Sequence, residues 1–192
     1  MYTLKPYYKP ISPFAWWEGA FSDEELDWLQ EQARAATSSA EIGTNANAIV
    51  SEKIRRSKVS WLRDEPKNNW AYQKFSDVAS SLNADYFGFD LEGMEELQLT
   101  NYSEEDRGTY GWHQDFGSTV PFRKLSLSLQ LSHPSDYDGG ELQIKCHSEA
   151  ETMNKKRGLI TVFPAWTLHQ VTPVTRGSRQ SLVAWVSGEP FK

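Results

Sequence analysis

A histidine and an aspartate two positions apart, His113 and Asp115, are the residues of this sequence best suited to metal chemistry. In an extended segment, residues i and i+2 point to the same side, so the imidazole and the carboxylate can converge on one point. Two ligands hold a metal poorly, and His169, on a separate expected strand, is the best third ligand among the four histidines of the chain. Two histidines and one carboxylate on one face of a metal, with the opposite positions open, suit non-haem Fe(II).

Arg179 follows His169 in the expected last strand and adds a second chemical function. Its guanidinium is always charged and can pair with a carboxylate through two parallel hydrogen bonds. Taken singly, a His-x-Asp pair is common, a lone histidine is more often structural, and a lone arginine usually lies at the surface. The order and spacing of the four residues together predict an Fe(II) site with a small keto acid held beside the metal.

The first half of the chain is expected to supply helical support for this site. FSDEELDWLQEQARAA, residues 21–36, predicts a helix that Ser22 caps, with Glu25 completing a capping box. NWAYQKFSDVASSLNADYF, residues 69–87, shows apolar residues at helical spacing and predicts a second helix. The segment 38–52 between them is polar and rich in Gly and Asn, which indicates a loop.

From about residue 94 the pattern changes to short β segments separated by turns. KLSLSLQLS, residues 124–132, alternates, with leucines on one face and Ser126, Ser128 and Gln130 on the other. Further strands are expected over 158–164, 168–174 and 180–188. Several short strands at this spacing favour a sandwich or barrel, so the fold class is α+β.

Composition limits the other classes of function. A length of 192 residues favours a single domain over 1–192, with 1–93 as helical and loop support and 94–188 as the β core. A net charge of −6 argues against a nucleic-acid partner. The single cysteine excludes an internal disulfide and suits a cytoplasmic location, and no apolar run predicts a signal sequence or a membrane span.

Three stretches resemble one enzyme family: TNYSEEDRGTYGWHQD, RKLSLSLQLSHPSDYDGGELQI and GLITVFPAWTLHQVTPVTRGSRQSLVAW. Over about 97–188 the chain is similar to the 2-oxoglutarate/Fe(II)-dependent dioxygenases of the prolyl 4-hydroxylase type, and most similar to the PKHD-type hydroxylase subgroup. The resemblance implies a double-stranded β-helix, or jelly roll, buttressed by the N-terminal helices.

The resemblance also implies roles for single residues. His113, Asp115 and His169 would be the iron ligands, and Arg179 would pair with the distal carboxylate of 2-oxoglutarate. Positions where the family places co-substrate contacts or a recurring aromatic residue are occupied by Tyr102, Tyr110, Gln130 and Trp185. At Gln130 some prolyl hydroxylases have a tyrosine instead, so this contact departs from the family pattern.

The implied cofactors are Fe(II), 2-oxoglutarate and O₂, with ascorbate as a supporting reductant. The implied reaction is hydroxylation of an unactivated C–H bond, most often of a prolyl residue in a protein or peptide, with segment 38–52 as a possible lid over a peptide groove. A free amino acid or another small molecule is an alternative substrate. A non-catalytic β-barrel binding module and a zinc hydrolase are alternative functions, although the hydrolase would leave Arg179 unexplained.

Overall fold

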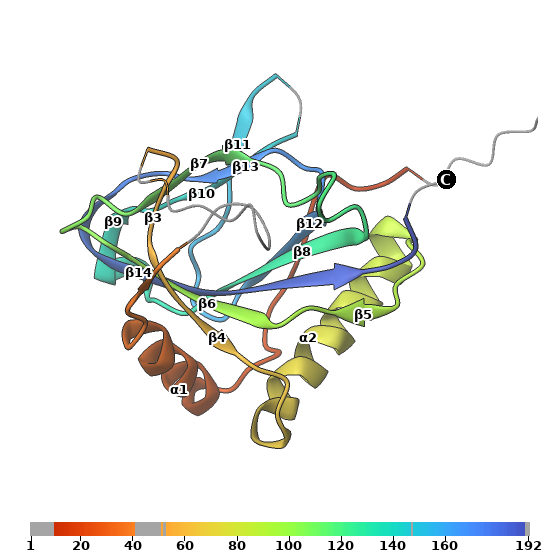
Figure 1. The fold of residues 1–192 in the computed structure, drawn as a ribbon, viewed down its shortest axis with the longest axis horizontal. Coiled ribbons are helices and arrows are strands. Elements are labelled where there is room, and N and C mark those ends of the chain that lie inside the picture. The colour runs from red at the N-terminus through yellow and green to blue at the C-terminus, as the bar shows by residue number, and fades with distance from the viewer. Residues whose placement is uncertain (1–9, 41–50, 52, 147, 191–192) are drawn as a thin grey trace, which may run out of the picture.

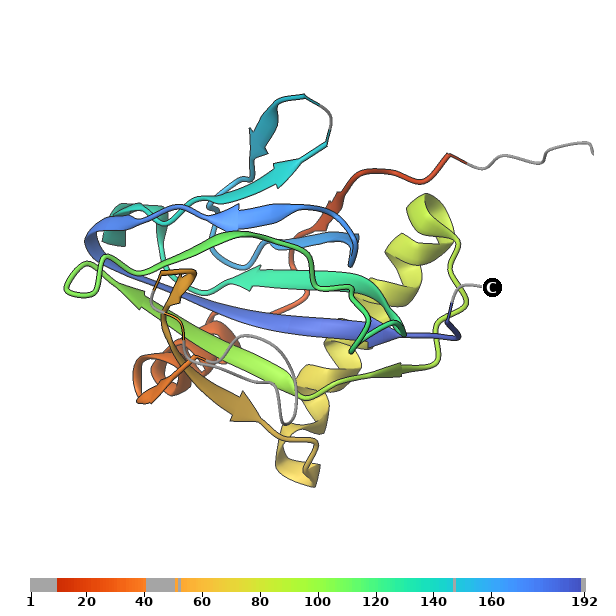
Figure 2. The ribbon, with the colours of Figure 1, turned by 45° about the horizontal axis from the view of Figure 1, so that its top comes forward.

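The structure, a computed structural model, describes residues 10–40, 51, 53–146 and 148–190. Two antiparallel sheets lie face to face, and two helices cover the outer face of the larger sheet (Figure 1). The turned view shows the same three layers, with the helices on the side away from the smaller sheet (Figure 2). The α+β class predicted from the sequence is therefore confirmed.

The larger sheet has nine strands within the described residues. Its main path runs in the order β1 (Ala15–Trp17), β12 (Ile160–Pro164), β8 (Arg123–Gln130), β14 (Val174–Ser187), β6 (Leu97–Ser103), β4 (Lys58–Leu62) and β2 (Ser38–Ser39). The short strands β5 (Gly93–Met94) and β9 (Tyr137–Gly139) pair with β14 outside this path. β14 thus has partners along both of its edges and forms the centre of the sheet.

The smaller sheet has five strands within the described part of the chain. Their order is β11 (Ala150–Thr152), β10 (Leu142–Lys145), β13 (His169–Val171), β7 (Thr109–His113) and β3 (Arg55–Arg56). Apart from β10 and β11, neighbouring strands in this order come from distant parts of the sequence, as in a jelly roll. The double-stranded β-helix expected from the family resemblance is therefore present.

Both predicted helices are confirmed. Helix α1 (Asp23–Arg34) begins at the predicted cap, where the Ser22 hydroxyl accepts from the Glu25 amide and the Glu25 carboxylate accepts from the Ser22 amide. Helix α2 (Asn69–Leu82) follows the 3₁₀ turn η2 (Pro66–Asn68) and continues into the π-helical turn η3 (Asn83–Phe87). A second 3₁₀ turn, η4 (Pro134–Asp136), precedes β9.

The alternation along β8 and β14 divides the molecule into a packed side and a cavity side. Leu127 and Leu129 of β8, with Leu182 of β14, are fully buried in one hydrophobic cluster with residues of α1 and α2. Residues at the alternate positions, among them Ser128 and Arg179, line a cavity between the sheets. The leucine face predicted from the sequence is therefore the face that packs against the helices.

Two expectations need correction or fall outside the structure. The last strand begins at Val174, six residues before the predicted start, so Arg179 lies inside the strand instead of at its opening. The reason is that β9 pairs with the first part of β14, a contact between distant segments that the local pattern does not reveal. Most of the segment proposed as a lid, 41–50 and 52, lies outside the described residues.

Within the described residues, no helix has both the length and the apolar character needed to cross a membrane.

Candidate metal centre

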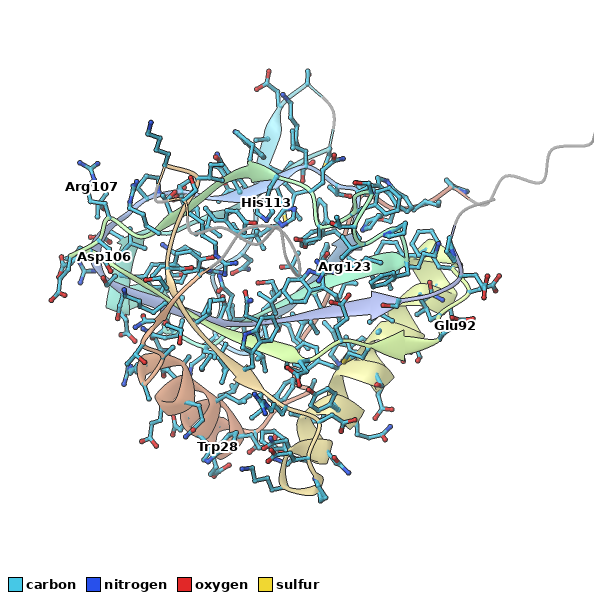
Figure 3. The ribbon with its side chains drawn as sticks, in the orientation of Figure 1. Trp28, Glu92, Asp106, Arg107, His113 and Arg123 are labelled. Atoms are coloured by element: carbon cyan, nitrogen blue, oxygen red, sulfur yellow. The ribbon has the colours of Figure 1, made fainter. Side chains whose placement is uncertain are left out.

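The structure brings together the three residues that the sequence analysis selected as metal ligands. His113 ends β7 and His169 begins β13, and the two are direct partners in the antiparallel register of the smaller sheet. Asp115 lies just beyond β7, with Oδ1 3.7 Å from His113 Nε2 and Oδ2 3.5 Å from His169 Nε2. One ligand atom from each residue lies within 4.8 Å of the others. Figure 3 shows His113 on the inner side of the smaller sheet.

Each imidazole is held in the tautomer that metal binding needs. His113 Nδ1 lies 2.8 Å from the Gly111 carbonyl oxygen, and His169 Nδ1 lies 2.9 Å from that of Thr167. A carbonyl oxygen can only accept, so Nδ1 carries the proton and donates in both rings. The Nε2 lone pairs are therefore left free, and both point at the Asp115 carboxylate.

The electrostatics of the cluster keep His113 and Asp115 deprotonated. Burial, followed by the neighbouring His169, lowers the pKa of His113 to about 3. Burial opposes ionisation of Asp115, but His169, His113 and the Ser126 hydroxyl outweigh it and bring its pKa to about 2. At neutral pH the site therefore offers a neutral His113 imidazole and a carboxylate, the protonation states that a transition metal binds.

The Asp115 carboxylate is fixed from two directions. The Ser126 hydroxyl of β8 donates to Oδ2 at 2.6 Å. The amides of Asp115 and Phe116 both donate to the Ala165 carbonyl, at 2.9 and 3.0 Å, which ties this segment to the end of β12. Arg123 Nη1 reaches the Asp115 carbonyl at 3.3 Å while its other nitrogens bind Glu95, and it points inward from the larger sheet in Figure 3.

Arg179 lies in the same cavity and is one of the largest fully buried side chains of the molecule, at 1% exposure. Within the described residues no carboxylate lies within ion-pair distance of it, and its Nε has no hydrogen-bond partner. Its guanidinium lies 5.5 Å from the ring centre of Tyr102, its register partner on β6. A buried guanidinium with an unmet donor suits a ligand that brings its own carboxylate.

Tyr110 and Trp185 also line the cavity. The Tyr110 ring stacks on His113 with ring centres 3.5 Å apart, and burial raises its pKa to about 12. Its hydroxyl therefore stays protonated and able to donate. Trp185 is 7% exposed, and its Nε1 has no hydrogen-bond partner within the described residues.

Gln130 is buried on the expected face of β8 but is not among the residues that line the cavity. Its Oε1 and the Tyr137 hydroxyl are both buried without a hydrogen-bond partner in the described residues. Burial raises the pKa of Tyr137, and Arg179 and Gln130 are close enough to oppose the rise. Tyr137 therefore lies at the Arg179 end of the site, where sequence reasoning missed it because DYDGG indicates only a turn.

The cavity has a volume of about 1030 Å³ and combines the site with apolar walls. Phe163 and Val183 contribute apolar surface near the polar groups. Sequence reasoning also missed Ser126 and Arg55 of this site. The alternation of β8 could have suggested Ser126, which shares a face with Gln130, whereas Arg55 lies in a polar stretch that gave no signal.

The fold and the side chains define a class of protein: a double-stranded β-helix whose inner surface offers two imidazoles, one carboxylate and a buried arginine. Comparison with known proteins shows what the chain is similar to. Residues 97–187 match the model of the 2OG-Fe(II) oxygenase superfamily. The superfamily implies Fe(II), 2-oxoglutarate and O₂ as cofactor and co-substrates, and the donor set described above fits them.

Relatives and solved structures are consistent with this match. A PKHD-type hydroxylase of Synechococcus sp. is 41% identical over 83 residues, which cover 41% of this chain and 37% of the relative. This chain thus matches well under half the length of that relative. A Pseudomonas putida prolyl-4-hydroxylase structure has a TM-score of 0.73 at 19% identity, covering 92% of this chain and 93% of the other. A Trichoplax adhaerens prolyl hydroxylase, in complex with a hypoxia inducible factor peptide fragment, has a TM-score of 0.73 at 16% identity, covering 91% and 83%.

Proposed function

We propose that this chain is a 2-oxoglutarate-dependent Fe(II) dioxygenase that hydroxylates an unactivated C–H bond, with a prolyl residue of a protein or peptide as the leading substrate. The observation that carries the proposal is the meeting of two functions in one cavity: the cluster of His113, Asp115 and His169, and the unpaired buried guanidinium of Arg179. A zinc hydrolase or a binding module would need only the first of them.

In this proposal the three clustered residues hold the metal on one face. His113 and His169 would bind through Nε2, because their Nδ1 protons are committed to backbone carbonyls. Asp115 would bind through a carboxylate oxygen, and the Ser126 hydroxyl holds that carboxylate in its orientation. Bound iron and 2-oxoglutarate would supply the activation of O₂, with oxidative decarboxylation to succinate and CO₂.

Arg179 would anchor the distal carboxylate of 2-oxoglutarate at the far end of the cavity. Tyr102 lies opposite it on β6 and Tyr110 lies against the His113 ring, so both would face the bound co-substrate. Gln130 would act at the same end together with Tyr137, whose hydroxyl is buried close to Arg179. The apolar wall of Phe163 and Val183 would keep bulk water away from the reacting atoms.

Two solved structures with a similar fold support a prolyl substrate. The Pseudomonas putida structure is a prolyl-4-hydroxylase, and the Trichoplax adhaerens enzyme was captured with a peptide fragment.

We extend the proposal to one domain over the whole chain, since one hydrophobic cluster joins both helices to the larger sheet. Ascorbate would serve as the reductant that keeps iron in the ferrous state.

The test has two stages. The first measures succinate release from 2-oxoglutarate by the Fe(II)-loaded protein with ascorbate, against an Asp115→Ala control. Release above that control supports the oxygenase, whereas zinc binding without turnover supports a hydrolase or a binding module. The second stage incubates the enzyme with proline-containing peptides and with free amino acids, and a mass gain of one oxygen confined to prolines supports the leading substrate.

A further inference from the structure

A second buried arginine in the cavity, Arg55 of β3, has no role in the chemistry described so far. It is 7% exposed and lines the cavity that contains the metal ligands and Arg179. Within the described residues, no carboxylate lies within ion-pair distance of its guanidinium. A buried cation without a countercharge is costly unless a ligand supplies one.

Among the described residues, Arg55 makes its hydrogen bonds and its ring contact with neutral groups. Nε donates to the Ser57 hydroxyl at 2.9 Å and Nη2 donates to Gln98 Oε1 at 2.8 Å. The guanidinium carbon lies 4.6 Å from the centre of the Tyr110 ring. These contacts fix the orientation of the Arg55 guanidinium. They use only two of its five N–H donors, and they do not balance its positive charge.

Tyr110 links Arg55 to the metal ligands. The same tyrosine ring that contacts the guanidinium stacks on His113, with ring centres 3.5 Å apart and planes 16° apart. A group bound to Arg55 would therefore lie beside the metal, on the side of the Tyr110 ring.

Arg179 lies elsewhere on the cavity wall. It belongs to β14 of the larger sheet, with Tyr102 as its register partner, whereas Arg55 belongs to β3 of the smaller sheet, with Tyr110 as its register partner. In the proposed function, Arg179 would hold the distal carboxylate of 2-oxoglutarate, and the metal would take the end that carries the keto group. Arg55 is thus left for the second substrate.

We propose that the substrate of this enzyme carries a carboxylate close to the C–H bond that is hydroxylated, and that Arg55 binds this carboxylate. The inference rests on the proposed function, because it takes 2-oxoglutarate as the ligand of Arg179. It refines the substrate class: a proline would be recognised with its own free α-carboxylate or with an acidic side chain beside it. Arg55 is then a determinant of specificity and has no part in binding 2-oxoglutarate.

The experiment measures binding of matched probes to the full chain loaded with Fe(II) and 2-oxoglutarate without O₂. One pair is N-acetylproline against N-acetylprolinamide. The other is an amidated proline-containing peptide with glutamate beside the proline, against the same peptide with glutamine. Isothermal titration gives the dissociation constants for the wild type, Arg55→Gln and Arg56→Gln. Arg56 is a matched control, because it neighbours Arg55 but donates to the carbonyls of Asp106 and Arg107 on the outside.

In the wild type, the carboxylate member of at least one pair is expected to bind at least about 10-fold more tightly than its neutral partner. The first pair identifies an α-carboxylate as the source, and the second identifies an acidic side chain. Arg55→Gln should abolish the preference and leave the affinity for 2-oxoglutarate within about twofold, whereas Arg56→Gln should keep the preference. Arg55→Lys retains the positive charge but lacks the planar guanidinium, so it should keep part of the preference. It replaces Arg55→Gln in the test if circular dichroism shows that Arg55→Gln does not fold.

Three results would overturn the inference: no preference in either pair, a preference that survives in Arg55→Gln, or a loss of 2-oxoglutarate affinity in Arg55→Gln as large as in Arg179→Gln. The proposed function fails separately. A wild type that releases no succinate contradicts the oxygenase, whereas a wild type that releases succinate but ignores the carboxylate contradicts only the role of Arg55.

Discussion

The two faces of strand β14 differ in how completely their polar groups are satisfied. On the face toward the helices, Leu182 and Ala184 are fully buried in the hydrophobic cluster. The one long polar side chain there, Gln180, accepts from Gln30 and Ser132 and donates to Asn101 and Ser178. On the cavity face, Arg179 Nε and Trp185 Nε1 are buried with no partner in the described residues.

This difference separates residues that build the fold from residues that wait for a ligand. A buried polar atom without a partner costs about 1–3 kcal/mol, so a fold keeps few of them. Within the described residues, four of the five such atoms belong to side chains at or beside the cavity: Gln130, Tyr137, Arg179 and Trp185. We infer that the cavity face is tuned to bound ligands at the expense of the stability of the free protein.

The largest expected effect is that of removing the metal carboxylate. Asp115→Ala should lower the affinity for Fe(II) by at least about 100-fold and abolish succinate release, because two imidazoles alone hold the ion poorly. Metal titration of the apoprotein and a succinate assay check both outcomes. Circular dichroism should show a folded variant, since the residue lies on the cavity side. Unchanged metal affinity would contradict the inference that the polar groups of the cavity face bind a metal.

The next largest effect is expected at the opposite end of the cavity. Arg179→Gln should raise the KM for 2-oxoglutarate by about 30-fold or more, because a buried guanidinium would no longer meet the distal carboxylate. The control is Arg176→Gln on the same strand, where the exposed guanidinium pairs with Asp138. Steady-state kinetics should show a normal KM for this control. Equal effects of the two substitutions would mean that charge on β14, and not the position of Arg179, governs binding.

A neighbouring pair of residues compares the two faces directly. Leu182→Ala on the packed face should lower the free energy of unfolding by about 2–5 kcal/mol, since it leaves a cavity among rigid neighbours. Val183→Ala removes a side chain that lines the ligand cavity, where no new void is sealed, and should cost less. Urea unfolding of the metal-free variants measures both values. A larger loss for Val183→Ala would reverse the assignment of the faces.

The sequence predicted the elements of this fold better than their boundaries. Local patterns found the capped helix α1 and the leucine face of β8, because capping and alternation are properties of neighbouring residues. They placed the start of the last strand too late, because the first part of β14 is a strand only through its pairing with β9. A strand that depends on a distant partner leaves little local signal.

The candidate site shows the same limit. His113 and Asp115 were recognisable because their spacing is local, and His169 and Arg179 because their order matched a family pattern. Arg55 and Tyr137 could not be found in this way. Each reaches the site from a short strand, β3 or β9, whose place depends on pairing with β7 or β14. Their local stretches contain no motif, so only the assembled sheets bring Arg55 to the cavity and Tyr137 close to Arg179.

The last expected effect is a pH dependence to which the cavity face contributes through His113. The folded pKa of His113 is about 3, below the ordinary value of 6.5, so the unfolded chain binds more protons between these values. The free energy of unfolding of the metal-free protein should therefore fall as the pH drops from about 6.5 towards 3, by at most about 1.4 kcal/mol per pH unit. Asp115, whose folded pKa of about 2 also lies below its ordinary 3.8, adds a loss only at lower pH.

Substitution separates this contribution from the general acid sensitivity of the chain. His113→Asn should flatten the slope of the unfolding free energy between pH 6.5 and about 4, because the titrating ring is gone. His133→Asn removes an exposed histidine and should leave the slope unchanged. Urea unfolding of the metal-free proteins across this range gives the slopes. If His113→Asn kept the wild-type slope, the acid sensitivity would lie outside the metal centre. Protonation of His113 would then not lower the free energy of unfolding as expected here.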